Sequence, residues 1–543
     1  MKLKKLTAIV LAGAMTISLA ACGGGDKSSG TATGSTGATA TASFLQPNTD
    51  AANTEETDET LTIGLSSEPS TLFGIAAGKT ENEDQIIRSA LTETLVKKNY
   101  ATGEIEPNLA SEWEWVDGTH LKFTLRDDVT MGDGTPLVAD DVVYTFNVCK
   151  EYCATSDVGK YLVGAVADDE HTVTIEFTTE APDFLTMVSW TDYGIVTEDE
   201  VNAAGGLEAA QTNPVVGNGP YKFVEWKNGQ SITLERNEDY WNTDYAGYYK
   251  TIVFTFTSDA AAREMAVESG DADVAVDMPV SQAATYASSD AVNTTIYSFG
   301  QETHLWYNMG DDSRATADAN VRAAIDKALD FDAIAQVGTS GTADASLSYW
   351  DTSCEFYQAN YTKEERDVDV DAAKELLAEA GYEDGLEITA LGLQDNTPVL
   401  TVMQANLAEA GITLTIDTPD TAQFVEAAFG GDYDLICVGD TPATRIPPNV
   451  MPFLQTLNVE GPGMVIGGPK WTSDEFDSKI TALITESDAD KVVELATELD
   501  EMVKADTICS NLYPEMKAAV YAKDLKGYNT IERGFIDVTT LYK

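Results

Sequence analysis

The segment 213–242 reads NPVVGNGPYKFVEWKNGQSITLERNEDYWN, and the interpretation of the whole chain starts from it. Its run Gly-Asn-Gly-Pro at 217–220 predicts a turn, because Gly and Asn accept positive φ and Pro fixes its own φ. A strand is expected from Tyr221, and Lys-Asn-Gly at 227–229 turns the chain back into a second strand. The segment therefore predicts an antiparallel hairpin that ends in an aromatic cluster.

A second ordered set of motifs lies between residues 103 and 142. Its motifs are GEIEPNLA at 103–110, RDDV at 126–129, DGTPL at 133–137 and ADDV at 139–142. Together with segment 213–242, this set resembles the extracellular solute-binding proteins of family 5, the dipeptide- and oligopeptide-binding receptors of ABC importers. The resemblance extends over residues 61–543, and Asn218 stands where that family usually has Thr.

This resemblance implies an α/β protein with a two-lobed, periplasmic-binding-protein-like fold, in the cluster with an extra inserted domain, and with mixed sheets covered by helices. Segment 386–438 supports this independently, because alternating strand and helix patterns favour a parallel sheet covered by helices. The expected parts are lobe one at 61–96, 214–300 and 511–543, the inserted domain at 97–213, and lobe two at 301–510.

Local signals add two expectations about helices. Apolar residues recur every four positions from Ile87 to Leu95 and predict a helix over 84–97. Asp371 is expected to cap the helix that follows it.

The N-terminus predicts export and lipid attachment. A basic run at 1–5 precedes an apolar run at 6–19, which is too short to span a membrane. Leu-Ala-Ala-Cys at 19–22 matches a bacterial lipobox, so Cys22 is expected to become the lipid-bearing first residue. Residues 23–60 are rich in Gly, Ser, Thr and Ala and then acidic, which favours a disordered tether.

Charge and residue usage exclude several classes of function. The net charge of −57 would repel a polyanion, so nucleic acid is not an expected partner. The three histidines are scattered and form no metal motif, and no nucleophile elbow or phosphate-binding loop occurs. We therefore expect that the protein is not an enzyme and that it holds no metal and no cofactor. The cysteines other than Cys22 are expected to be buried thiols.

The fold places the ligand site beyond the carboxyl ends of the sheet strands. This points to the loop after Val438, with Asp440, Thr441, Arg445 and Ile446 as candidates. The loop at 66–71 would face it, with Ser67 and Ser70 as its candidates.

The resemblance also implies a departure at this site. In the peptide-binding members an Asp before Pro pairs with the amino terminus of the peptide, and that position falls on Ile446. Either Asp440 does that work from another angle, or the ligand has no free amino end there. Arg445 can equally bind an anionic group through two hydrogen bonds, or be a solvated or structural residue.

Aromatic residues supply the remaining candidates. Trp306 and Asn308 lie in a strand that enters lobe two, and Tyr349 with Trp350 follows in a loop. These side chains are candidates for a pocket wall that stacks on a peptide or sugar, and core packing is the alternative.

The sequence thus predicts a monomeric, lipid-anchored binding protein on the outer face of a cell membrane. Its expected ligand is a small solute, most simply an oligopeptide, which it passes to ABC permease subunits. One alternative keeps the fold and changes the ligand to an oligosaccharide or another small polar solute. The other is a secreted surface hydrolase.

Overall fold

The structure is a computed structural model. Cys22, residues 23–56 of the predicted tether, Cys153, Thr441, Arg445 and Ile446 lie outside the residues that it describes. Residues 57–60, predicted as the end of the tether, instead begin strand β1 (Thr57–Leu65), because they pair with β10 (Tyr249–Phe256). Within the part that it does describe, no helix is long and apolar enough to cross a membrane. The described residues are 57–73, 75, 82–99, 104–152, 161–180, 184–211, 213, 217–243, 247–310, 313–352, 354, 356–440, 471, 473–530 and 535–543.

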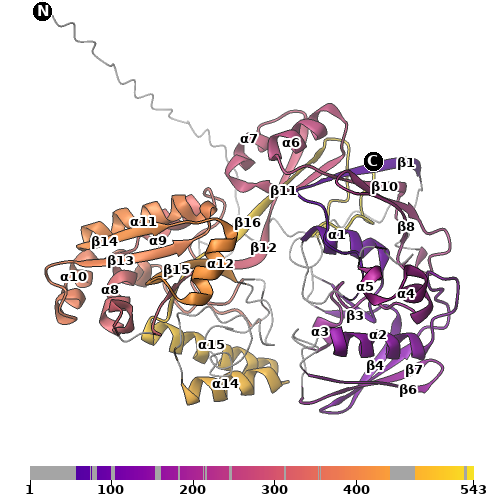
Figure 1. The fold of residues 1–543 in the computed structure, drawn as a ribbon, viewed down its shortest axis with the longest axis horizontal. Helices are drawn as coiled ribbons and strands as arrows, with labels where there is room; N and C mark the ends of the chain where they lie inside the picture. The colour runs from indigo at the N-terminus through magenta and orange to yellow at the C-terminus, as the bar shows by residue number, and fades with distance from the viewer. Residues whose placement is uncertain are drawn as a thin grey trace, which may run out of the picture. The chain divides into compact units, whose positions relative to one another are not determined.

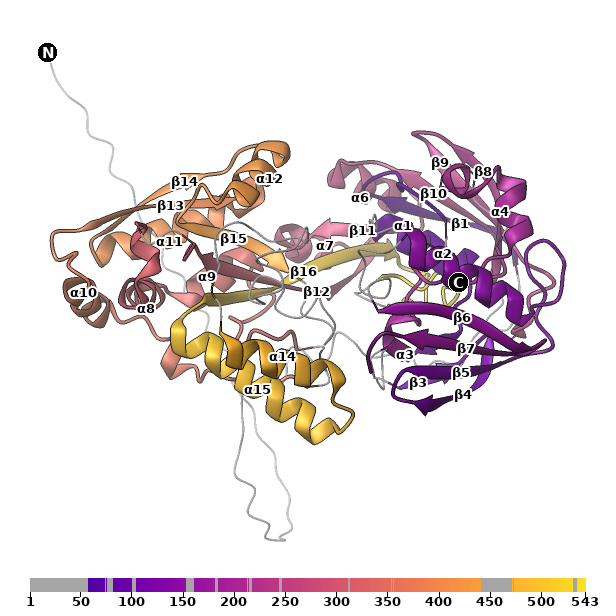
Figure 2. The same cartoon turned by 60° about the horizontal axis from the view of Figure 1, so that its bottom comes forward.

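A ten-stranded mixed sheet forms the centre of the fold. Two long strands, β12 and β16, run antiparallel to each other through its middle (Figures 1 and 2). The strands are, in sheet order, β14 (Ile412–Asp417), β13 (Leu386–Gly392), β15 (Leu435–Asp440), β12 (Val292–Tyr307), β16 (Cys509–Ala522), β11 (Val274–Pro279), β1 (Thr57–Leu65), β10 (Tyr249–Phe256), β9 (Ser231–Arg236) and β8 (Tyr221–Lys227).

The sheet has two halves that share the long strands. The first half is β11, β1, β10, β9 and β8, and the second half is β15, β13 and β14. β11 pairs with β16 over 517–521, whereas β15 pairs with β12 over 302–307. The quoted segment gives β8 and β9, which pair antiparallel at the outer edge of the first half, so the predicted hairpin is confirmed.

The second half follows the alternation read from the sequence. β13 pairs in parallel with both β14 and β15, as predicted. Consecutive residues of β12 and β15 point to two separate apolar cores, one containing Leu305 and Cys437 and the other containing Trp306 and Ile436. Burial of both faces is typical of a parallel sheet covered by helices.

Helices cover these faces, and α14 and α15 lie side by side in both views (Figures 1 and 2). The helices are α1 (Asn82–Leu91), α2 (Ala139–Tyr152), α3 (Phe184–Met187), α4 (Glu198–Ala204), α5 (Leu207–Ala210), α6 (Ala260–Ser269), α7 (Ala283–Ala287), α8 (Ala319–Ala328), α9 (Phe331–Gly338), α10 (Val370–Glu379), α11 (Thr397–Glu409), α12 (Thr421–Gly430), α14 (Asp474–Thr485) and α15 (Ala489–Asp506).

A separate four-stranded antiparallel sheet lies within the region predicted as the inserted domain. It packs with α2 around its own apolar core. A two-stranded sheet, β2 with β3, precedes it in the chain. The strands are β2 (Val96–Lys98), β3 (Ile105–Pro107), β4 (Ala110–Asp117), β5 (His120–Leu125), β6 (Leu162–Asp169) and β7 (Thr172–Phe177), with the order β4-β5-β7-β6 in the larger sheet.

Two local predictions about helix ends were wrong. The helix expected over 84–97 ends at Leu91, because Leu91 packs in the core of the first half whereas Leu95 packs in the core of the four-stranded sheet. The cap of α10 is Asp369 rather than Asp371. Asp369 has a non-helical backbone, with φ −132° and ψ 83°, and its carboxylate accepts the Ala372 N–H at 2.9 Å.

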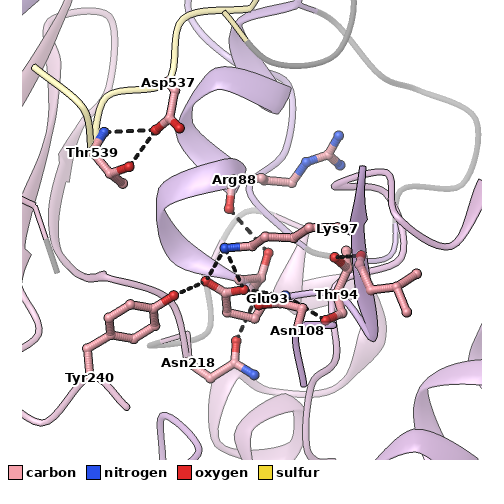
Figure 3. Close-up of polar contacts among 11 residues, drawn as sticks. Arg88, Glu93, Thr94, Lys97, Asn108, Asn218, Tyr240, Asp537 and Thr539 are labelled. Carbon is pink, nitrogen blue, oxygen red and sulfur yellow. Dashed lines mark hydrogen bonds and ion pairs between the residues drawn. The ribbon is translucent and has the colours of Figure 1, made fainter. Parts of the chain in front are cut away.

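The turn at the start of the quoted segment is hydrogen-bonded to the main chain of Glu93, whose buried carboxylate contacts other segments (Figure 3). Glu93 accepts hydrogen bonds from the Tyr240 hydroxyl and, at 2.5 Å, from Asn108 Nδ2, and it pairs with Lys97 at 3.2 Å. Its own N–H donates to Asn218 Oδ1 at 2.9 Å. The network therefore holds the turn, the hairpin and the start of the four-stranded-sheet region together.

Four of the cysteines fall in described positions. Cys149, Cys354, Cys437 and Cys509 are buried and form no disulfide there, which confirms the buried-thiol prediction for these four. Burial raises the pKa of the Cys437 thiol to about 12, so this sulfur is a poor nucleophile at neutral pH.

Candidate ligand-binding site

Strand ends from both halves converge on one short segment of β16. At the carboxyl end of β11, Pro279 pairs with Lys517 of β16. At the carboxyl end of β15, Asp440 pairs with Glu302 of β12, and Glu302 itself pairs with Pro514 of β16. We call residues 514–517 the crossover. Because β1 and β10 run parallel to β11, and β13 runs parallel to β15, their carboxyl ends also point towards it.

The predicted loop at 66–71 lies at this edge and is held by the first turn of α1. Glu83 Oε1 accepts the Ser66 hydroxyl and, at 3.2 Å, the Ser67 N–H. Ser70 donates its N–H and its hydroxyl to the Asp84 carboxylate at 2.6 and 2.8 Å. Ser67 and Ser70 themselves are exposed, so the structure brings both candidates into one fixed loop at the strand ends.

Asp277 lies beside this loop in an unusual backbone conformation. Its φ is +52°, and the pairing of β11 with β16 shifts register at this point. Bulges of this kind re-aim a side chain and occur next to functional sites. A non-glycine residue in this region costs about 1–3 kcal/mol and persists only when its surroundings hold it.

The Asp277 carboxylate is poorly compensated. Tyr297 donates its hydroxyl to Oδ1 at 3.5 Å, and Oδ2 is enclosed without a hydrogen bond from the described residues. Burial, and then the neighbouring Glu83 carboxylate, raises the pKa of Asp277 above its ordinary value, while Lys517 and Arg263 act in the opposite direction. At this edge of the first half, the acidic side chains of Asp277 and Glu83 therefore lie near two basic side chains, those of Lys517 and Arg263.

The second half presents aromatic rings along β12 and in segment 349–350. The His304 and Tyr349 rings stack with centroids 4.8 Å apart, and Trp306 meets Tyr349 edge-on at 6.1 Å. Trp350 donates its indole N–H to Ala496 O at 3.0 Å. Trp306, Tyr349 and Trp350 are at most 1% exposed, so in this structure they occupy the core cluster. Their contact with ligand stays a prediction.

Buried carboxylates accompany these rings. Asp500 of α15 accepts the Ser348 hydroxyl at 2.5 Å and the Tyr349 N–H at 3.2 Å. Burial raises the pKa of Asp500 to about 6. Glu302, at the crossover, accepts the Ser346 hydroxyl. Segment 346–349 is therefore pinned between α15 and β12.

Asn308 has a positioning role in the second half. Its Nδ2 donates to Gly431 O at 2.9 Å and to Tyr433 O at 2.7 Å, just before β15 begins. The side chain is 2% exposed. Asp440 ends β15 opposite Glu302, and its side chain lies outside the described part, as do Thr441, Arg445 and Ile446.

Sequence reasoning missed Asp277 and its neighbour Arg263. The available signal was a charged residue inside an apolar strand, Val-Ala-Val-Asp-Met at 274–278, and a lone Arg in the Ala-rich helix α6. Neither pattern reveals the left-handed backbone. Among the described residues, no group of three or more His, Cys, Asp or Glu is placed to hold a metal ion.

A comparison with known protein families identifies the family of this chain. The chain matches the model of the bacterial extracellular solute-binding proteins, family 5, over residues 104–460. The chain belongs to this family. Its fold is the two-lobed α/β fold expected from the sequence, with a mixed sheet covered by helices.

Relatives of this family 5 protein include named peptide-binding proteins. It is 24% identical to the oligopeptide-binding protein OppA of Bacillus subtilis, over 86% of this chain and 90% of that one. It resembles the structure of DppA from Helicobacter pylori in complex with the peptide STSA, with a TM-score of 0.73, 21% identity, and 89% and 98% of the two chains covered. It also resembles AgaA of Agrobacterium tumefaciens in complex with agropinic acid, with a TM-score of 0.68, 22% identity, and 88% and 96% covered.

Proposed function

We propose that this family 5 protein is the lipid-anchored binding component of an ABC importer and that its ligand is a small peptide. The convergence of strand ends from both halves on the crossover carries the proposal, since ligands of open α/β sheets lie beyond the carboxyl ends of strands. A peptide is favoured because a relative is named an oligopeptide-binding protein and a structural neighbour holds the peptide STSA.

In this proposal lobe one begins at Thr57 with β1, and the lobes and the inserted domain otherwise keep the bounds predicted from the sequence. The two lobes close on the ligand, and the closed shape is what a permease recognises. The protein acts as a monomer and carries out no reaction on its ligand. The loop at 66–71 and the segment after β15 contribute contacts from opposite lobes.

Thermal-shift measurements test the ligand class. A ligand that binds the folded state alone stabilises it by about 2.7 kcal/mol at a concentration of 100 Kd. We expect a rise in melting temperature with an equimolar pool of tri- to pentapeptides and none with a matched pool of oligosaccharides. The reverse pattern would overturn the peptide assignment. Mass spectrometry of the same incubated pools should find no cleavage product, and a product would favour the hydrolase alternative.

The second candidate ligand is another small polar solute. The resemblance to a structure that holds agropinic acid favours including this class. A pool of amino-acid and sugar-acid conjugates forms a third arm of the same experiment. A shift with this pool alone would keep the importer role and replace the peptide.

The lipid anchor is tested separately. The Cys22→Ala variant should leave the membrane fraction and appear in the soluble exported fraction, because the acceptor of the lipid is gone. A variant that stays with membranes would contradict lipid attachment at Cys22 and leave the ligand assignment unaffected.

A further inference from the structure

Two buried arginines occupy comparable places in the two halves of the sheet. Arg263 lies on α6 and Arg322 on α8, and each is 4% exposed. Each guanidinium donates hydrogen bonds to main-chain carbonyls of other segments. They differ in where those carbonyls lie in the fold.

Arg263 joins the carboxyl ends of three parallel strands. Nη1 donates to Thr257 O at 2.6 Å and to Ser258 O at 3.1 Å, immediately after β10. Nη2 donates to Asp277 O at 3.0 Å, at the bulge of β11. The side chain also lies against Gly64 of β1, where an added Cβ would be 3.7 Å from Arg263 Cδ.

We propose that Arg263 is a positioning residue for ligand binding, which fixes the carboxyl ends of β10 and β11 and the left-handed backbone of Asp277. The inference rests on the proposed function for the binding role. The planar fork of Arg263 presents Nη1 to the end of β10 and Nη2 to Asp277 at the same time, a fixed spread of donors that the single ammonium nitrogen of Lys does not have. Without the fork, the strained Asp277 relaxes and the edge that faces the crossover changes shape.

Arg322 supplies the matched control. Its Nη1 donates to Ala317 O at 2.9 Å, and its Nη2 donates to Asp506 O at 2.8 Å. Asp506 precedes the first residue of β16, Cys509, which pairs with Trp306. These contacts lie at the end of β16 away from the crossover. Loss of Arg322 should therefore reduce stability and leave the binding edge unchanged.

Four full-length variants test the proposal: Arg263→Lys, Arg263→Gln, Arg322→Lys and Arg322→Gln. The probe is the pool of tri- to pentapeptides, and affinity, melting temperature and amide hydrogen exchange are measured for each variant. We expect both Arg263 variants to bind the pool at least about tenfold more weakly, while both Arg322 variants stay within about twofold of the parent. Faster amide exchange at 276–278 should accompany the Arg263 changes alone.

The outcomes separate the two claims. The Arg263 variants could bind the pool as tightly as the Arg322 variants and show an equal loss of melting temperature. That result would mean that Arg263 has a structural role only. Full recovery of affinity by Arg263→Lys would show that charge rather than the fork matters, and would overturn the proposal. A parent protein that binds no pool member ends the peptide assignment. Amide hydrogen exchange at 276–278 then decides the positioning role without a ligand.

Discussion

Glu93 and Asp500 are both buried carboxylates, but their surroundings differ. Glu93 receives hydrogen bonds from Tyr240 and Asn108 and pairs with Lys97, a cation. Asp500 receives bonds from Ser348 and from the Tyr349 N–H, and burial raises its pKa to about 6. The comparison teaches that burial alone does not make a carboxylate stabilising. Both carboxylates hold segments together, but the partners of Glu93 include a cation, whereas Ser348 and the Tyr349 N–H are neutral donors to Asp500.

Removal of Glu93 should have the largest effect. Glu93→Ala leaves the Tyr240 hydroxyl and the Asn108 amide buried without their acceptor and the Lys97 charge without its partner. We expect a loss of about 3–5 kcal/mol in the free energy of unfolding, measured by urea denaturation. The control is Glu114→Ala, because Glu114 is 70% exposed and 3.7 Å from Lys122. A loss equal to that of the control would contradict a fastening role for Glu93.

Asp500→Asn should change how stability depends on pH. A carboxyl whose pKa rises on folding stabilises the native state fully below its unfolded pKa of about 4, and this contribution is lost as pH rises through the folded value of about 6. The shift of about 2 units corresponds to about 3 kcal/mol. The variant should therefore lose about 3 kcal/mol less than the parent between pH 4 and pH 7.

Chemical denaturation across that pH range measures the difference. Asp141, whose pKa burial also raises to about 6, remains in both proteins and keeps part of the slope. Equal slopes for parent and variant would show that Asp500 titrates outside this window.

Tyr240→Phe should have an intermediate effect. The change removes one donor to the Glu93 carboxylate and keeps the ring in place, so we expect a loss of about 2 kcal/mol. Burial, with the Glu93 charge second, raises the pKa of Tyr240, so the hydroxyl stays a donor at neutral pH. A double-mutant cycle with Glu93→Ala isolates the pair, and a coupling energy near zero would contradict their direct contact.

Asn218→Thr should have the smallest effect. Asn218 accepts the Glu93 N–H and donates towards Ile195 O at 3.4 Å and Met131 Sδ at 3.5 Å. A Thr hydroxyl can replace one of these contacts, so we expect a loss of about 1 kcal/mol. The control, Asn213→Thr, changes an exposed Asn in the same segment. Thermal unfolding distinguishes the two, and equal melting temperatures would contradict a role for the amide.

Sequence alone predicted what local chemistry determines. The hairpin at 221–236 follows from its turn residues, and the parallel second half follows from its alternating pattern. The end of α1 was missed because Ile87 and Leu95 share a spacing but pack in different cores. The cap of α10 was missed because Asp367, Asp369 and Asp371 alternate, and backbone conformation alone chooses among them.

The candidate site was predicted less completely. The loop at 66–71 was found because it follows a recognisable strand. Asp277 and Arg263 were missed, because their roles depend on contacts between segments far apart in the sequence. Trp306 and Tyr349 were recognised as aromatic candidates, but no sequence pattern separates a pocket wall from a core.

The position of β16 has a consequence for how the chain is made. This strand comes last in the sequence, yet it lies between β12 and β11 in the middle of the sheet. A nascent chain that stops before Cys509 holds four strands on one side and five on the other, without the strand that pairs with both sets. Residues 509–522 must therefore be synthesised before the central sheet can close, and truncation before Cys509 should abolish the native fold rather than trim it.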